Sequence, residues 1–142
     1  MLRYHYYPDL AVCDYFHVPG LRAIGWLDPF HEFERGEVPE AFRLKLSQLL
    51  LKAWHPFPYS GGQVCGMCEG IYGQQNLFVP CDSCIFVAPD LIGHYIAEHN
   101  YRPPTVFQEA VAACPPMLSD DYFELLTRKG ITDEALARVW RY

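Results

Sequence analysis

The sequence contains no lysine or arginine between residues 53 and 101, although the same stretch carries Glu69, Asp82, Asp90 and Glu98. A surface that binds nucleic-acid phosphates needs clustered cations. The missing cations therefore argue against nucleic-acid binding by this segment and leave only the flanking helices for such contacts. The whole chain has a formal net charge of −6 and is rich in aromatic residues. This surface suits a basic protein partner.

Long apolar runs are also missing. No run approaches the roughly 18 residues that cross a bilayer, and residues 1–7 lack the uninterrupted apolar stretch of a secretion signal. We therefore expect a cytoplasmic protein with no membrane contact. In that compartment, six cysteines indicate metal ligands and buried thiols rather than three disulfides. Cys13 and Cys114 have no cysteine nearby in the sequence and are expected to be buried in the core.

The common catalytic signatures are absent as well. We find no H-E-x-x-H, no phosphate-binding loop, no dinucleotide-binding glycine motif, no nucleophile elbow and no zinc-deaminase pattern. The remaining polar candidates are Asp28, His31 and Glu32. A carboxylate and an imidazole this close in sequence can form an acid–base pair. The same residues are also explained by a turn that Asp28 caps and in which His31 forms a hydrogen bond. We favour this interpretation and keep a small enzyme as the alternative.

What is present is the composition of a packed domain, with 142 residues of which 51% are hydrophobic. A chain of this length buries a core without disulfides. Apolar periodicity, prolines and glycines predict short strands and helices. The strands are expected at residues 13–18, 21–27, 63–64, 76–79 and 85–87. The helices are expected at residues 39–54, 89–99, 103–114 and 119–130, with a fifth beginning at Thr132.

These elements predict an α+β fold in which a small antiparallel zinc-knuckle hairpin packs against four to five short helices. Residues 1–116 are expected to form a single zinc-binding domain. Residues 117–142 are expected to form a C-terminal helical pair packed on it.

Two C-x2-C motifs, Cys65–Cys68 and Cys81–Cys84, stand twelve residues apart. One such turn places two sulfurs on the same side of an ion, and a second turn returned by a hairpin completes a tetrahedron. The spacing therefore predicts a structural Zn²⁺ held by the four cysteines, and we rank this set first. Incidental buried thiols and a redox dithiol are the alternative explanations.

A second ligand set combines Cys65 and Cys68 with His94 and His99, which are separated by four residues. This separation lies within the range of Cys₂His₂ zinc sites. On a regular helix the five-residue offset rotates the two imidazoles about 140° apart, so the set needs a loosened last turn. Alternatively, neither histidine is a ligand: His99 is an ordinary core residue and His94 an exposed one. We rank the set of Cys65, Cys68, His94 and His99 second.

The pattern H-Y-I-x-x-H-x-Y-x-P-P-x-x-F at residues 94–107 resembles the signature of a small uncharacterised bacterial family of zinc-binding domains. Residues 25–28, His31 and residues 39–42 resemble the amino-terminal part of that family. The likeness covers roughly residues 20–114, and the family has no known activity.

The resemblance also bears on the ligands. Members of that family carry a C-x2-C where this chain has Cys65 and Cys68, often preceded by a histidine where this chain has Gln63. Many have glycine-rich turns in place of the second cysteine pair. The resemblance therefore implies His94 and His99 as ligands.

Together these observations predict a structural-zinc domain that serves as a protein-interaction or regulatory module. A small enzyme using Asp28 and His31 is one alternative. A zinc-ribbon nucleic-acid binder is another, which the missing cations in residues 53–101 disfavour.

Overall fold

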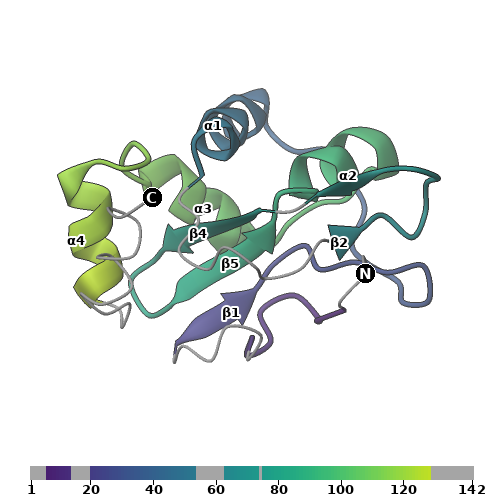
Figure 1. Cartoon of the computed structure of the whole chain (residues 1–142), viewed down its shortest axis with the longest axis horizontal. Helices are drawn as coiled ribbons and strands as arrows, with labels where there is room; N and C mark the ends of the chain where they lie inside the picture. Colours follow the sequence, from purple (N-terminus) through teal and green to yellow (C-terminus); the bar gives the residue numbers. More distant parts are fainter. Residues whose placement is uncertain (1–5, 14–19, 54–62, 74, 129–142) are drawn as a thin grey trace.

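The structure is a computed structural model that describes residues 6–13, 20–53, 63–73 and 75–128. Its centre is a three-stranded mixed sheet in the order β1-β5-β4 (Figure 1). β1 (Leu21–Ala23) runs parallel to β5 (Ile85–Pro89), and β4 (Asn76–Pro80) runs antiparallel to β5. A separate two-stranded sheet pairs β2 (Gln63–Val64) with β3 (Tyr72–Gly73).

Every residue of β4 and β5 is buried, and all of them except Asn76 at the start of β4 are apolar. A continuous apolar run without polar alternation is typical of a strand covered on both faces. The indole Nε1 of Trp26 donates to the carbonyl oxygen of Val87 at 2.9 Å, which ties the segment after β1 to the central strand. The strands expected at residues 76–79 and 85–87 are thus the core of the fold.

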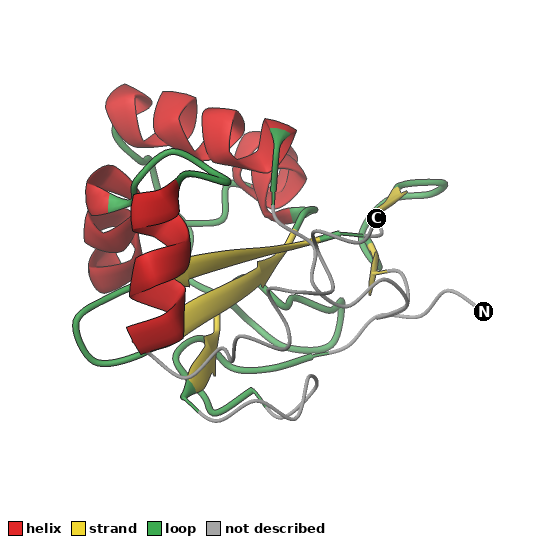
Figure 2. Ribbon diagram, turned by 60° about the vertical axis from the view of Figure 1, so that its left-hand side comes forward, coloured by secondary structure: helices red, strands yellow, loops and turns green. Residues whose placement is uncertain are grey.

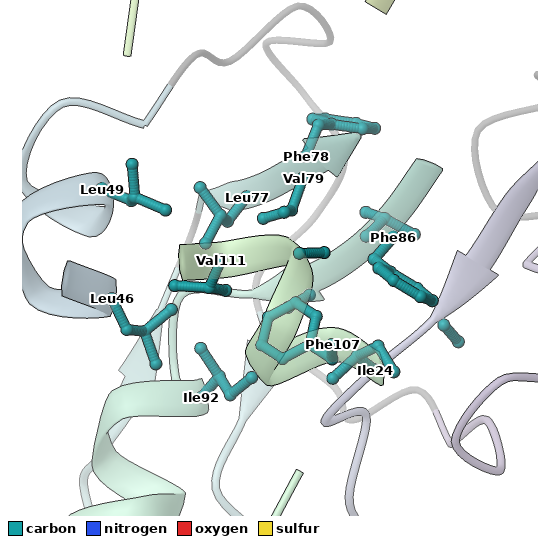
Figure 3. Close-up of a cluster of buried hydrophobic side chains, with 14 of the residues drawn as sticks. Ile24, Leu46, Leu49, Leu77, Phe78, Val79, Phe86, Ile92, Phe107 and Val111 are labelled. Atoms are coloured by element: carbon teal, nitrogen blue, oxygen red, sulfur yellow. The ribbon is translucent and has the colours of Figure 1, made fainter. Parts of the chain in front are cut away.

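Four helices, α1 (Glu40–Leu51), α2 (Ile92–His99), α3 (Thr105–Ala113) and α4 (Asp120–Arg128), gather on one side of this sheet (Figure 2). α3 and α4 contact β4, and α1 packs against α2 and α3. Phe107 on α3 is fully buried, and its ring meets the ring of Phe86 edge-on at 5.7 Å (Figure 3). The ring of Phe42 on α1 meets Phe107 edge-on at 6.1 Å. This aromatic contact joins the helical layer to the sheet.

The structure confirms the α+β class and the four helices predicted before residue 130. α2 begins later than expected, at Ile92, because Pro89 is the last residue of β5. α4 packs on the sheet through Tyr122, whose hydroxyl donates to the carbonyl oxygen of Phe78 at 2.6 Å.

Three expectations remain untested. The helix from Thr132 lies outside the described residues, and so does nearly all of the strand expected at residues 13–18. The division of the chain at residue 116 stays a prediction.

Among the described residues, no helix combines the length and the apolar character that crossing a bilayer requires.

Candidate metal centre

The β2–β3 hairpin holds the first cysteine pair in a tight turn. The backbone N–H of Cys65 donates to the carbonyl oxygen of Ile71 at 3.0 Å, and that of Cys68 donates to the carbonyl oxygen of Cys65 at 3.4 Å. Gly70 has a φ of +77°, a conformation that side chains with a Cβ rarely adopt. The loop therefore folds back on itself and brings both sulfurs to one place.

The hairpin lies against the connection from β5 to α2, which sequence reasoning missed. Asp90 and Gln75 exchange hydrogen bonds: the N–H of Asp90 donates to the carbonyl oxygen of Gln75 at 2.9 Å, and Asp90 Oδ2 accepts from Gln75 N–H at 3.2 Å. A Cβ added to Gly73 would stand 1.8 Å from Oδ1 of Asp90. Only glycine allows this approach, whereas sequence reasoning placed Asp90 inside the helix expected at residues 89–99.

α2 supplies the two histidines. Asn100 adopts the left-handed conformation with a φ of +57°, donates its N–H to the carbonyl oxygen of Tyr95 and ends the helix directly after His99. The rings of His94 and His99 lie 5.0 Å apart, edge to face. The offset expected from a regular helix therefore does not keep the two imidazoles apart.

Four donor side chains from the hairpin and α2 meet, with their ligand atoms all within 4.8 Å of one another. We call them the Cys₂His₂ cluster: Cys65, Cys68, His94 and His99. The His99 Nε2 atom lies 3.1 Å from Cys68 Sγ and 3.5 Å from Cys65 Sγ. With metal–sulfur and metal–nitrogen bonds of about 2.3 and 2.0 Å, a tetrahedral zinc site separates sulfur from nitrogen by about 3.5 Å. The spacing of the cluster therefore fits a single ion.

The burial of His94 also fits a role as a metal ligand. Its Nε2 atom is buried and has no hydrogen-bond partner, and a buried polar atom left unpaired costs free energy. Burial lowers the pKa of His94, and His99 lowers it further, so the neutral imidazole that a metal binds is favoured. Desolvation and the neighbouring Cys65 raise the pKa of Cys68, so a metal must displace a proton from that thiol.

The structure does not bring the second cysteine pair to this cluster. Cys81 and Cys84 flank the turn between β4 and β5, next to the paired residues Pro80 and Ile85. The β2–β3 hairpin and α2 lie at the other end of these strands, and five strand residues span about 17 Å. The expected hairpin would have returned Cys81 and Cys84 to Cys65 and Cys68. Instead, β4 pairs with β5, and of the two predicted ligand sets the second is assembled.

The polar candidates Asp28, His31 and Glu32 do not belong to the Cys₂His₂ cluster. Oδ1 of the buried Asp28 accepts the backbone N–H groups of Phe30 and His31 at 3.0 Å and contacts His31 Nδ1 at 2.8 Å. Tyr6 stacks on the His31 ring at 3.7 Å, and Glu32 is exposed. The hydrogen bonds fit the turn interpretation. A carboxylate that orients an imidazole also suits a general base, so the enzymatic alternative stays a prediction.

Comparison with known proteins gives one match. The family model described as a domain of unknown function (DUF7919) matches residues 5–112, a range that includes the whole Cys₂His₂ cluster. No curated protein and no solved structure matches the chain significantly.

Proposed function

Because this chain belongs to the DUF7919 family, whose description assigns no activity, we propose a role from its own donors: the Cys₂His₂ cluster binds one structural Zn²⁺. Two thiols and two imidazoles are donors that zinc prefers in proteins. Four protein ligands complete its tetrahedron, whereas a catalytic zinc keeps one position for water or substrate. The main support for this proposal is that all four donor atoms lie within 4.8 Å of one another.

Such an ion would join the β2–β3 hairpin to α2. Each strand of the β2–β3 hairpin has two residues, and a two-stranded hairpin of that size is at best marginally stable by itself. Cys65 and Cys68 come from this hairpin, and His94 and His99 come from α2. Zinc would therefore fix the hairpin on the helix, in the way that structural metal sites replace a missing hydrophobic core. A reducing compartment such as the cytoplasm would keep the thiols available.

Elemental analysis of purified variants tests this ligand set. We expect one zinc per wild-type chain and a loss of most bound zinc in Cys68→Ser and His94→Ala. The controls are Cys81→Ser and His31→Ala, which replace the same residue types outside the cluster and should keep the metal. If Cys81→Ser lost zinc while His94→Ala retained it, the four-cysteine set would be correct and the Cys₂His₂ assignment wrong.

We further propose that the zinc-fixed hairpin is a protein-binding surface. Ile71 and Tyr72 on this hairpin are 38% and 55% exposed, and Glu69 beside them is exposed too. Glu98 on α2 interacts electrostatically with His94 and Cys68 and adds a negative charge next to the hairpin. Aromatic residues are enriched at protein interfaces, and the lack of cations in residues 53–101 favours a basic partner.

Affinity capture from the source cells tests this role. A basic protein should be retained by tagged wild-type chain and released both by zinc chelation and by Tyr72→Asp, which places a charge in the surface. Leu51→Asp is the control, because Leu51 is 83% exposed on α1, outside this surface. Identical capture by wild type and a Tyr72→Asp protein that still contains zinc would contradict the proposed surface.

A further inference from the structure

The second cysteine pair forms its own site at the turn between β4 and β5. Only Asp82 and Ser83 separate Cys81 from Cys84, and the N–H of Cys81 donates to the carbonyl oxygen of Cys84 at 2.9 Å. The two cysteines continue the register of the last ladder pair, Pro80 and Ile85, and residues in such a register have Cα atoms about 4.5–5.5 Å apart. This separation lies within the range of about 4.4–6.8 Å that a disulfide bridges.

The side chains are already in contact. The two sulfur atoms lie 2.9 Å apart, and the backbone N–H of Cys84 donates to Cys81 Sγ at 3.1 Å. Two thiolates on one tetrahedral zinc would stand about 3.8 Å apart, given bonds of about 2.3 Å. The two sulfur atoms are therefore closer together than two thiolates bound to one zinc ion would be. Their distance places them for a direct sulfur–sulfur bond.

The pair is also accessible. Both cysteines are half-buried rather than buried, and both line a surface cavity of about 740 Å³. Arg22 and Arg128 belong to the same lining, and so do Asp82 and Ser83 of the turn. This space admits a small peptide, whereas Cys13 and Cys114 are enclosed in the core.

We propose that Cys81 and Cys84 form a reactive dithiol that closes to an intrachain disulfide by exchange with a small peptide disulfide, for which oxidised glutathione is the probe. This site is separate from the proposed zinc site and does not depend on it.

The exchange needs no other reactant. The thiolate of Cys81 attacks one sulfur of the external disulfide, which forms a mixed disulfide and releases the first external thiolate. The thiolate of Cys84 then attacks the Cys81 sulfur and releases the second. Two electrons pass from the two cysteines to the external disulfide, and the two protons end on the two released thiols.

The order of attack follows from the environment of each sulfur. Cys81 Sγ accepts the backbone N–H of Cys84 at 3.1 Å and donates to the carbonyl oxygen of Cys84 at 3.0 Å. Burial raises the pKa of Cys84 to about 12, and its contact with Cys81 raises it in the same direction. Because the raised pKa makes Cys84 the poorer thiolate, Cys81 is assigned the first attack and Cys84 the second.

Thiol mapping on the full-length, zinc-loaded chain tests the proposal. The protein is equilibrated in mixtures of reduced and oxidised glutathione, quenched with acid, alkylated and digested for mass spectrometry. We expect the peptide containing Cys81 and Cys84 to lose two hydrogen atoms and both alkylation sites as the oxidised fraction rises, while zinc per chain stays constant. In Cys84→Ser the reaction should stop at a glutathione adduct on Cys81.

Two results would overturn the dithiol. One is full alkylation of Cys81 and Cys84 at every glutathione ratio. The other is a second bound zinc per chain that disappears in Cys81→Ser, which would make the pair a metal site. Because zinc is counted separately in every sample, failure of the dithiol and failure of the Cys₂His₂ site are distinguished.

Discussion

Removal of zinc is expected to lower the free energy of unfolding by about 4 kcal/mol, relative to protein in free zinc at about 1,000 times the dissociation constant. The unfolded chain cannot bring the hairpin and α2 together, so the ion binds the folded state preferentially and its binding energy adds to stability. Urea unfolding of wild-type protein in buffered zinc and in a chelator measures the difference.

The variant His99→Ala provides the matched test. It should have the same stability in zinc and in chelator, because it lacks the ligand whose Nε2 lies 3.1 Å from Cys68 Sγ. His31→Ala should keep the full zinc dependence, since His31 hydrogen-bonds to Asp28 outside the cluster. A wild-type unfolding curve that does not shift between zinc and chelator would contradict a structural role for the ion.

The second large effect is expected in the core, where Phe107→Ala should cost about 3–5 kcal/mol. Phe107 has no exposed surface and contacts both Phe42 of α1 and Phe86 of β5. Its removal leaves a cavity between the helical layer and the sheet that these close-packed rings cannot fill. Urea unfolding at fixed zinc concentration measures the cost.

The adjacent residue supplies the control. Val106 is 49% exposed on the same helix, so Val106→Ala should change stability by no more than about 0.5 kcal/mol. Both variants should keep one zinc per chain, because α3 supplies no ligand to the cluster. Equal losses in the two variants would show that Phe107 does not connect the layers as described.

Much of the secondary structure follows from local signals. Pro39 and Pro104 are the N-cap residues directly before α1 and α3, and the fixed φ of proline, −58° and −54° here, is compatible with that position. The apolar runs of β4 and β5 are visible as strands in the sequence. The bounds are less accurate: Pro89 reads as a helix start, yet β-pairing with Asn76 retains it in β5.

The candidate site depends on information that local patterns do not contain. The cysteine and histidine spacings suggested two ligand sets, both containing Cys65 and Cys68. The choice between them rests on which strand β4 pairs with, and its register with β5 sends Cys81 and Cys84 to the far end of the sheet. Parallel pairing of β1 with β5 joins segments more than sixty residues apart, which no local periodicity reveals.

X-ray absorption at the zinc edge of the purified wild-type protein examines the ligands directly. The Cys₂His₂ cluster predicts a first shell of two sulfur atoms at about 2.3 Å and two nitrogen atoms at about 2.0 Å. A shell of four sulfur atoms without nitrogen, or protein that binds no zinc at all, would contradict it.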